Sequence, residues 1–246
     1  MKINELDIIK KLILDAESTV FFGGAGVSTA SGIPDFRGNT GLYRIVSEYG
    51  APPEEILSHN YFLDDPETFY RYYRENMLYP NASPNGAHKA LAQLEARGML
   101  SAVITQNIDG LHQAAGSENV IELHGSVLRN YCVDCGRSYT LSDILEKDGV
   151  PRCDCCGGLV RPDVTLYGEA LDTGAFYAAE NACINADVLI VGGTSLTVNP
   201  AASLVASYYG DHLIIVNKSP TPYDEFAEYV IREPIEDVLR YIVENI

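Results

Sequence analysis

The sequence has no hydrophobic run long enough to cross a membrane, and it has few basic residues. It contains 17 Lys and Arg against 34 Asp and Glu, which gives a net charge of −17. Surfaces that bind nucleic acid carry an excess of basic residues, so the composition argues against this class of partner. Acidic charge of this kind is typical of a solvated, soluble surface, and it is also compatible with Lys-rich protein partners. The sequence has no internal repeat and no low-complexity segment.

Residues 1–17 also lack the apolar stretch of a signal peptide. Charged residues alternate there with apolar ones, as in an amphipathic helix. We therefore expect a cytoplasmic protein that does not bind a membrane. At 246 residues the chain is long enough for one large domain, or for a large domain with a smaller insert.

Five of the six cysteines are clustered, and disulfides are not expected in a reducing compartment. The cluster contains two Cys-x-x-Cys pairs separated by 17 residues, each followed by glycine: Cys132 with Cys135, and Cys153 with Cys156. Two such pairs at this spacing predict a structural zinc site, whereas a redox-active dithiol would explain only one pair. Cys155 is an alternative fourth ligand, but Cys156 restores the two-residue spacing. The isolated Cys183 is expected in a helix and in the hydrophobic core.

Short apolar, β-branched runs alternate with helical patterns along most of the chain. The expected strands are residues 19–22, 102–105, 120–123, 188–191, 213–216 and 229–231. The expected helices are residues 4–17, 85–97, 173–185, 200–208 and 235–243. This alternation predicts an α/β fold with a doubly wound parallel sheet, similar to a Rossmann fold.

Two stretches interrupt the alternation and predict a smaller second lobe. Residues 41–80 are Tyr-rich with a helical pattern, and residues 127–162 contain the cysteine pairs of the zinc ribbon. The larger Rossmann-like lobe then consists of residues 1–40, 81–126 and 163–246. We expect a single domain over residues 1–246, with a ligand cleft between its two lobes.

A Gly-rich turn follows the first expected strand. Gly23, Gly24 and Gly26 allow the backbone to approach an anion, and Ser28 and Thr29 supply small hydroxyl groups. The turn matches the dinucleotide-binding Gly-x-Gly-x-x-Gly pattern only in part, because Thr29 occupies the third glycine position. The segment that follows cannot continue as a helix, and it carries a carboxylate, an aromatic ring and a guanidinium group: Asp35, Phe36 and Arg37.

Polar side chains also follow later strands. Asn107 and Asp109 come directly after residues 102–105, where they are equally typical of an ordinary turn and helix cap. His124 ends the strand at residues 120–123, and its imidazole can accept a proton near neutral pH. His112 is the competing histidine. Residues 192–196 and 217–218 add polar loops at two further strand ends, although each alone is typical of a plain loop.

Together these motifs resemble the signature of the sirtuins, which are NAD-dependent protein-lysine deacylases. The resemblance rests on Gly-Ala-Gly-x-Ser, Gly-Ile-Pro-Asp-Phe-Arg, Gln-Asn-Ile-Asp and His-Gly, and it covers nearly the whole chain. It implies the two-lobe architecture and the removal of acetyl groups from lysine in proteins. NAD would be consumed as co-substrate, with nicotinamide, O-acetyl-ADP-ribose and free lysine as products. A mono-ADP-ribosyltransferase or an NAD hydrolase on the same scaffold is the alternative.

The resemblance also implies roles for individual residues. His124 would be the general base, with Asn107 and Asp109 as catalytic residues of the nicotinamide pocket. The NAD-binding set would be Gly24, Ala25, Gly26, Ser28, Thr29, Asp35, Phe36, Arg37, Tyr43, Gln106, Asn107, Ile108, Asp109, His124, Gly193, Thr194, Ser195, Asn217, Lys218 and Ile235. The acyl-lysine site would consist of Val164, Thr165, Tyr167, Gly168 and Val198. An extended edge at residues 161–169 is expected to pair with a peptide backbone.

Two tyrosines in the helical insert bear on the choice of acyl group. Sirtuins that remove succinyl or malonyl groups carry a tyrosine and, three residues later, an arginine at these positions. Tyr70 matches the tyrosine, but Tyr73 stands in place of the arginine, and Arg74 should point elsewhere on a helix. A buried acyl carboxylate without a cation is costly, so the resemblance implies a preference for acetyl-lysine over succinyl-lysine.

Overall fold

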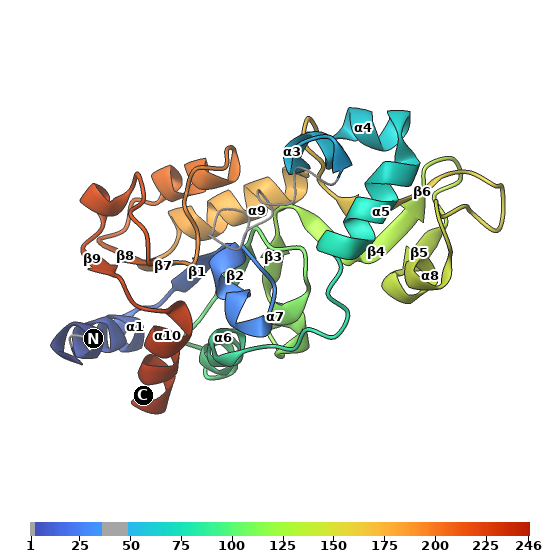
Figure 1. Cartoon of the computed structure of the whole chain (residues 1–246). Coiled ribbons are helices and arrows are strands. Elements are labelled where there is room, and N and C mark those ends of the chain that lie inside the picture. The colour runs from blue at the N-terminus through green and yellow to red at the C-terminus, as the bar shows by residue number, and fades with distance from the viewer. Residues whose placement is uncertain (1–2, 36–48) are drawn as a thin grey trace.

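The computed structural model describes residues 3–35 and 49–246, and its largest feature is a six-stranded parallel sheet (Figure 1). The strands are β1 (Thr19–Gly23), β2 (Ala102–Thr105), β3 (Val120–Glu122), β7 (Val188–Gly192), β8 (His212–Val216) and β9 (Tyr229–Ile231). Their order is β3-β2-β1-β7-β8-β9. The chain first builds outward from β1 to β3 and then continues from β7 on the other side, so the sheet is doubly wound, as predicted.

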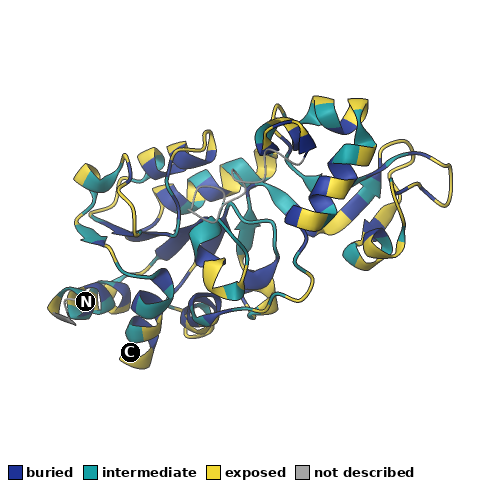
Figure 2. Ribbon diagram, viewed as in Figure 1, coloured by how far each residue is buried: buried dark blue, intermediate teal, exposed yellow. Residues whose placement is uncertain are grey.

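Helices cover both faces of this main sheet (Figure 2). One face carries α1 (Ile3–Asp15), α6 (Gly86–Ala96) and α10 (Ile235–Glu244), and the other carries α9 (Thr173–Ile184) and η4 (Ala201–Ser207). Because successive side chains of a strand alternate, β1 places Phe21 in the first cluster and Phe22 in the second, both fully buried. Cys183 lies in the second cluster, as expected, and the helix expected at residues 200–208 is the tighter 3-10 helix η4.

A second group of elements lies at the end of the molecule away from both termini (Figure 1). It is called the small sheet region here and consists of β4 (Gly125–Cys132), β5 (Ser138–Thr140), β6 (Val160–Val164), α3 (Pro53–Ile56), α4 (His59–Asp64), α5 (Pro66–Asn76) and α8 (Leu141–Glu146). Its antiparallel strands have the order β5-β4-β6. The region has its own hydrophobic cluster, in which Phe69, Tyr70 and Tyr73 of α5 are at most 1% exposed.

The main sheet and the small sheet region join at the start of β4. Gly125 has φ of 75°, and a Cβ atom there would lie 2.0 Å from Asp163 O, so only glycine fits. Val164, at the end of β6, pairs with Gly125. The junction therefore brings His124 next to the segment that follows β6.

Four short elements complete the fold of the residues that the structure describes: η1 (Ala25–Val27), η2 (Thr29–Ser31), α7 (Leu111–Ala114) and η5 (Asp224–Phe226). Of these, η1 and α7 follow the ends of β1 and β2, where the predicted ligand-binding loops begin. Among the helices of the described residues, none is both long and apolar enough to cross a membrane.

Candidate active site and metal centre

A cavity of about 660 Å³ lies at the carboxyl ends of β1, β2 and β7, where the main sheet meets the small sheet region. Ligands of open α/β sheets bind at this edge. Most of the predicted site residues line the cavity: Gly24, Ala25, Gly26, Ser28, Asp35, Gln106, Asn107, Ile108, Asp109, His124, Val164, Thr165, Tyr167, Gly168, Gly193, Thr194, Ser195, Val198 and Asn217. Residues that are far apart in the sequence therefore converge on one space.

Two glycine turns, one after β1 and one after β7, pack against each other at the cavity wall. The Gly26 N–H donates to Gly193 O over 2.8 Å. A Cβ atom at Gly26 would lie 2.8 Å from both the Cα and the O atom of Gly193, and Gly193 itself has φ of 60°. Glycine at both positions thus permits direct contact between the backbones. The Gln106 side chain ties the second turn to β2 by donating to Thr194 Oγ1 over 3.0 Å.

Ser28 lies at the centre of a polar network beside these turns. Its hydroxyl donates to Asp109 Oδ2 over 2.6 Å and accepts a hydrogen bond from Asn107 Nδ2 over 3.0 Å. The Asn107 amide also donates to Gly24 O, and Asp109 Oδ1 accepts the Leu111 N–H. Asp109 therefore accepts the N–H of the first residue of α7 and lines the cavity at the same time. Because Ser28 is 1% exposed, the network fixes the orientation of both side chains.

Two buried histidines lie behind this network. His88 accepts the Asn85 N–H at Nδ1 over 3.3 Å, and its Nε2 lies 3.5 Å from Ser28 Oγ. His112 packs against the His88 ring, and neither of its ring nitrogens has a hydrogen-bond partner among the described residues. Burial lowers the pKa of His112 to about 3, so its imidazole is neutral. His112 is absent from the cavity wall, which favours His124 as the functional histidine.

His124 is held by one backbone contact that sets its tautomer. Its Nδ1 lies 2.8 Å from Gln106 O. A carbonyl oxygen can only accept, so Nδ1 carries the proton and Nε2 is left as the acceptor. Burial lowers the pKa of His124, although the Gln106 hydrogen bond opposes this effect, and the neutral form is therefore favoured. This arrangement suits a general base.

The segment after β6 forms another wall of the cavity. The Thr165 N–H donates to His124 O over 3.0 Å, so this segment is attached to the histidine. The Tyr167 N–H donates to Leu57 O, and Tyr167 O accepts the His59 N–H, both over 3.0 Å. At Tyr167 the backbone edge that was expected to accept a peptide strand is therefore already paired with the small sheet region.

An ion pair between Arg161 and Glu169 holds the same segment in place. Arg161 donates from Nη1 and Nη2 to the two carboxylate oxygens of Glu169 over 2.6 and 2.9 Å. The Leu166 N–H adds a third hydrogen bond to this carboxylate. Burial opposes ionisation of Glu169, but the hydrogen bonds from Arg161 and Leu166 outweigh it and lower the pKa to about 2. Glu169 is therefore ionised and holds the segment in place at neutral pH.

The small sheet region also contains a candidate metal centre. The Sγ atoms of four cysteines all lie within 4.8 Å of one another: Cys132, Cys135, Cys153 and Cys156. Cys155 is exposed and lies outside this cluster, so the structure agrees with the ligand set preferred from the spacing. Four thiolates fit a tetrahedral zinc ion and leave no position for a reactive water.

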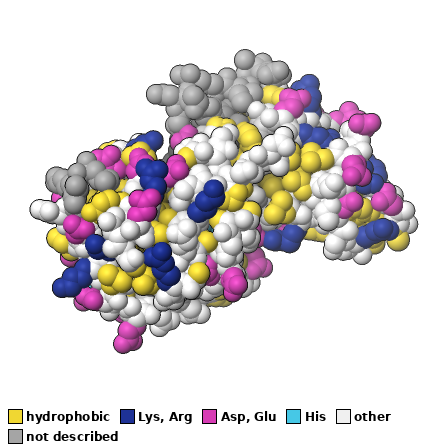
Figure 3. Space-filling view, turned by 90° about the horizontal axis from the view of Figure 1, so that it is seen from below, with side chains coloured by type: hydrophobic (Ala, Val, Ile, Leu, Met, Phe, Trp, Pro, Cys, Tyr) yellow, Lys and Arg dark blue, Asp and Glu magenta, His cyan; other side chains and the backbone are white. Residues whose placement is uncertain are grey.

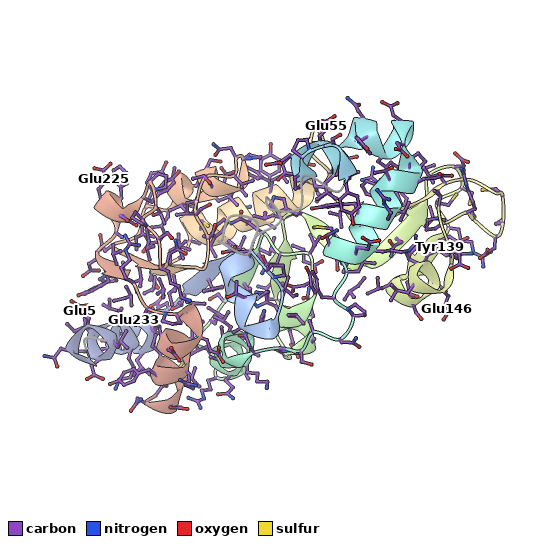
Figure 4. All side chains as sticks on the ribbon, viewed as in Figure 1. Glu5, Glu55, Tyr139, Glu146, Glu225 and Glu233 are labelled. Atoms are coloured by element: carbon purple, nitrogen blue, oxygen red, sulfur yellow. The ribbon has the colours of Figure 1, made fainter. Side chains whose placement is uncertain are left out.

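Tyr139 supports this metal centre from β5. Its hydroxyl donates to Cys153 Sγ over 3.2 Å, and this hydrogen bond lowers the pKa of Cys153 to about 6. This hydrogen bond thereby favours the metal-binding thiolate form of Cys153 alone. Figure 4 labels Tyr139 and Glu146, which mark this end of the molecule, remote from α1 and α10.

The arrangement of turns, histidine and cysteines agrees with a known family. A sequence model of the Sir2 family matches residues 24–200, which include both glycine turns, His124 and the four clustered cysteines. The chain belongs to the Sir2 family. The "NAD-dependent protein deacetylase" of Clostridium acetobutylicum is 51% identical over 243 residues, which are 98% of each chain.

Solved Sir2 structures share the whole fold. A complex of Sir2 with a deacetylated p53 peptide and 3'-O-acetyl ADP ribose has a TM-score of 0.90 at 41% identity, and the match covers 100% of this chain and 98% of that one. A complex of Sir2 with a p53 peptide and NAD+ has a TM-score of 0.87 at the same identity and coverage. The resemblance and the fold class predicted from the sequence are both confirmed.

Three of the predicted residues do not line the cavity of this Sir2 chain. Thr29 is exposed, and its hydroxyl donates to Gly26 O over 3.0 Å. Lys218 is also exposed. Ile235 begins α10 in the core, where its Cδ1 packs against Gly192 of β7. Three further predicted residues lie outside the described part of the chain: Phe36, Arg37 and Tyr43.

Sequence analysis missed the cavity residues that the small sheet region contributes to the Sir2 fold. They include Leu57, Asn76, Met77, Tyr79, Val127, Leu128, Leu141 and Leu166, and Tyr73 lines the same cavity. One signal could have found part of this set. Tyr73, Asn76 and Met77 follow the i, i+3, i+4 spacing of one helix face at the end of α5, and all three line the cavity.

Proposed function

We propose that this chain removes acetyl groups from lysine side chains of proteins, using NAD and releasing nicotinamide, O-acetyl-ADP-ribose and free lysine. The observation that carries the proposal is His124, whose neutral tautomer leaves Nε2 as acceptor in a cavity that also presents Asn107 and Asp109. Membership of the Sir2 family and the relatives named NAD-dependent protein deacetylase support the same reaction.

NAD would bind along the two glycine turns. The turns at residues 24–28 and 193–195 line the cavity and would lie against its phosphates, and Asn217 would lie near the adenosine ribose. The predicted roles of Thr29, Lys218 and Ile235 rest on the family resemblance alone, as do those of Phe36, Arg37 and Tyr43.

Asn107 and Asp109 would receive the nicotinamide end. Both Asn107 N–H groups are engaged by Gly24 O and Ser28 Oγ, so its side-chain oxygen is the group that remains for a ligand. The Asp109 carboxylate accepts from Ser28 and Leu111 and still has lone pairs for an amide N–H. Ile108 would pack against the nicotinamide ring.

His124 would act as the base of the reaction. NAD supplies a ribose carbon at which the acetyl oxygen replaces nicotinamide. Nε2 of His124 would then accept a proton from a ribose hydroxyl, so that this oxygen attacks the acetyl carbon. The lysine nitrogen would leave with a proton, and one water molecule would then add to the acetyl carbon that bridges the two ribose oxygens, which gives O-acetyl-ADP-ribose. The walls of the cavity would keep water from the reacting sugar. The acetyl-lysine would lie along Val164, Thr165, Tyr167, Gly168 and Val198.

Zinc would support the structure and take no part in the chemistry. The four cysteines of the metal centre leave no open coordination position, and zinc binding would stabilise the fold of β4–β6. We further propose one catalytic domain over residues 1–246. Its large lobe would comprise residues 1–40, 81–126 and 163–246, and its small lobe residues 41–80 and 127–162.

Acetylated proteins are the proposed partners, in the cytoplasm, and neither nucleic acid nor a membrane is expected to bind. Free cysteines at the metal centre support a reducing compartment. On the face shown in Figure 3, the Lys and Arg side chains of the described residues are scattered among acidic ones and form no broad basic patch.

Product analysis tests the proposed function. The protein is incubated with an acetyl-lysine peptide, with and without NAD, and the products are weighed by mass spectrometry. Loss of acetyl from the peptide together with O-acetyl-ADP-ribose, in the NAD sample only, is the expected result. ADP-ribose attached to the peptide, or released free without deacetylation, would instead support the transferase or hydrolase alternative.

A further inference from the structure

Leu196, in the loop after β7, has a backbone conformation that is unusual for a residue with a side chain. Its φ is 53°, and no other non-glycine residue in the described part of the chain has a positive φ. This left-handed region is open to glycine but costly for residues with a Cβ atom. Three residues earlier the same loop uses glycine: Gly193 has φ of 60°, and a Cβ atom there would lie 2.6 Å from Val27 N. At residue 196 the chain instead carries a leucine, so its side chain has to offset the unfavourable backbone.

The Leu196 side chain is anchored in the hydrophobic core. It is 3% exposed and belongs to the second hydrophobic cluster, on the face of the main sheet that carries α9 and η4. Phe22 of β1 and Val191 of β7 belong to the same cluster. Burial of a leucine side chain stabilises a fold by at least as much as a left-handed residue costs. Packing of the side chain can therefore hold the loop in this conformation.

This anchor lies between two stretches of the cavity wall. Leu196 is not itself among the described residues that line the cavity, but residues 193–195 before it and Val198 after it do. The first stretch is the turn proposed to lie against the phosphates of NAD. Val198 belongs to the proposed acyl-lysine site. The short link between the two proposed sites is thus fixed in place at Leu196.

The Leu196 backbone is also connected to the proposed base. The Leu196 N–H donates to Thr194 Oγ1 over 3.3 Å, and the same oxygen accepts the Gln106 side chain over 3.0 Å. Gln106 O in turn accepts His124 Nδ1 over 2.8 Å. A displacement of Leu196 would therefore disturb the glycine turn first and, through Gln106, the end of β2 that holds His124.

We infer that Leu196 is a positioning residue, whose buried side chain holds the loop after β7 so that the NAD turn and the acyl-lysine wall are both formed before either ligand binds. The inference rests on the proposed function for the identity of the two ligands. A preformed site binds more tightly, because binding does not have to order the loop. If residue 196 served only to turn the chain, glycine would serve better there.

Leu196→Gly distinguishes an anchor from a turn, because it removes the side chain and relieves the left-handed backbone at the same time. Loss of the anchor should weaken NAD binding, measured by calorimetry, and raise the KM for an acetyl-lysine peptide, each by about tenfold. Leu196→Met keeps the apolar volume and should restore both values to within about twofold of the wild type. Wild-type or tighter binding in Leu196→Gly would overturn the inference and leave residue 196 as a turn only.

Leu213→Ala is the matched control for a general loss of stability. Leu213 is a leucine of the same cluster, 6% exposed, but it lies on β8 and is not among the described residues that line the cavity. Leu196→Gly and Leu213→Ala should both unfold at lower temperatures than the wild type. With all proteins folded at the assay temperature, only Leu196→Gly should weaken both ligands. An equal loss of binding in the two variants would refute a positioning role.

Hydrogen exchange in the free wild-type protein tests the preformed loop without any variant. The Leu196 amide should already exchange slowly in the absence of ligands. Fast exchange there would overturn the inference, whether or not Leu196→Gly folds. Turnover of the acetyl-lysine peptide tests the proposed function separately. If the wild type binds NAD but does not deacetylate, the proposed function fails, and the NAD affinity of Leu196→Gly still decides the inference.

Discussion

Removal of the His124 imidazole should separate the two stages of the proposed reaction. In His124→Ala the ribose hydroxyl loses its base. The proposed nicotinamide site depends on hydrogen bonds among Ser28, Asn107 and Asp109, none of which involves His124. We therefore expect nicotinamide release and exchange to continue while formation of O-acetyl-ADP-ribose falls.

The size of the loss follows from the contacts of His124. A positioned base contributes roughly 10²–10⁴-fold to the rate. This factor corresponds to about 3–5 kcal/mol of barrier. The same substitution removes the 2.8 Å hydrogen bond to Gln106 O, which costs about 1 kcal/mol of folding stability. Catalysis should thus suffer far more than stability, and the variant should remain folded.

Two assays on one preparation distinguish the stages. Exchange of labelled nicotinamide into NAD in the presence of acetyl-peptide reports the first stage, and mass spectrometry of O-acetyl-ADP-ribose reports the second. His212→Ala is the control, because His212 lies on β8, away from the cavity, where it pairs with Glu228. Near-normal formation of O-acetyl-ADP-ribose by His124→Ala, or an equal loss of both stages, would refute the reasoning.

The pH dependence of the wild-type protein gives a second view of the same residue. The base works only when neutral, and burial lowers the pKa of His124 below its ordinary value of 6.5. As pH falls through 6.5, most of the imidazole therefore stays neutral. As the pH is lowered, kcat/KM should therefore stay constant down to pH 6.5 and decline only below that value. A decline that is complete above pH 6.5 would contradict the assignment.

Three further predictions concern the cavity turn, the metal centre and the acyl group. Gly26→Ala should force the two glycine turns apart, because its Cβ would lie 2.8 Å from Gly193 Cα. NAD affinity, measured by calorimetry, should therefore fall about tenfold or more. Normal affinity would contradict the proposed phosphate site. Cys156→Ser should lose zinc and Cys155→Ser should keep it by elemental analysis, and the reverse pattern would make Cys155 the ligand. Acetyl-lysine should be preferred over succinyl-lysine, because Arg74 donates to Lys147 O and Ile144 O in the small sheet region and is therefore not placed to pair with a succinyl carboxylate. A loss of succinyl activity in Arg74→Ala would show that Arg74 reaches the acyl group.

The main sheet was predictable because its strands are buried on both faces. All five residues of β1 and of β7 are buried, so each strand reads as a short apolar run bounded by polar or glycine residues. The loops at the carboxyl ends of these strands then had to meet at one edge. For that reason Gly26, Asn107, His124 and Gly193 could be placed in one site before the structure was known.

The cavity residues of the small sheet region were not predictable in the same way. Tyr73 and Leu166 are far apart in the sequence, and they meet only because α5 packs on the small sheet. The α5 sequence indicates an aromatic helix, but it does not indicate which tyrosine finds a hydrogen-bond partner. Tyr70 reaches Val160 O and Tyr73 reaches no described residue, a difference set by tertiary packing. Ile235 differs in the other direction: the family resemblance assigned it to the NAD site, but it packs in the hydrophobic core.

The junction after His124 explains why base and substrate segment are aligned. Gly125 lets the chain turn from the main sheet into β4 against Asp163 O, with no room for a side chain. The same turn presents His124 O to the Thr165 N–H, while the His124 ring reaches back to Gln106 O. His124 thus links the end of β2, through its proposed catalytic imidazole, to the proposed lysine-binding segment. The hydrogen bond from Thr165 therefore fixes the proposed base relative to the substrate segment, and the hydrogen bond to Gln106 O fixes it relative to the main sheet.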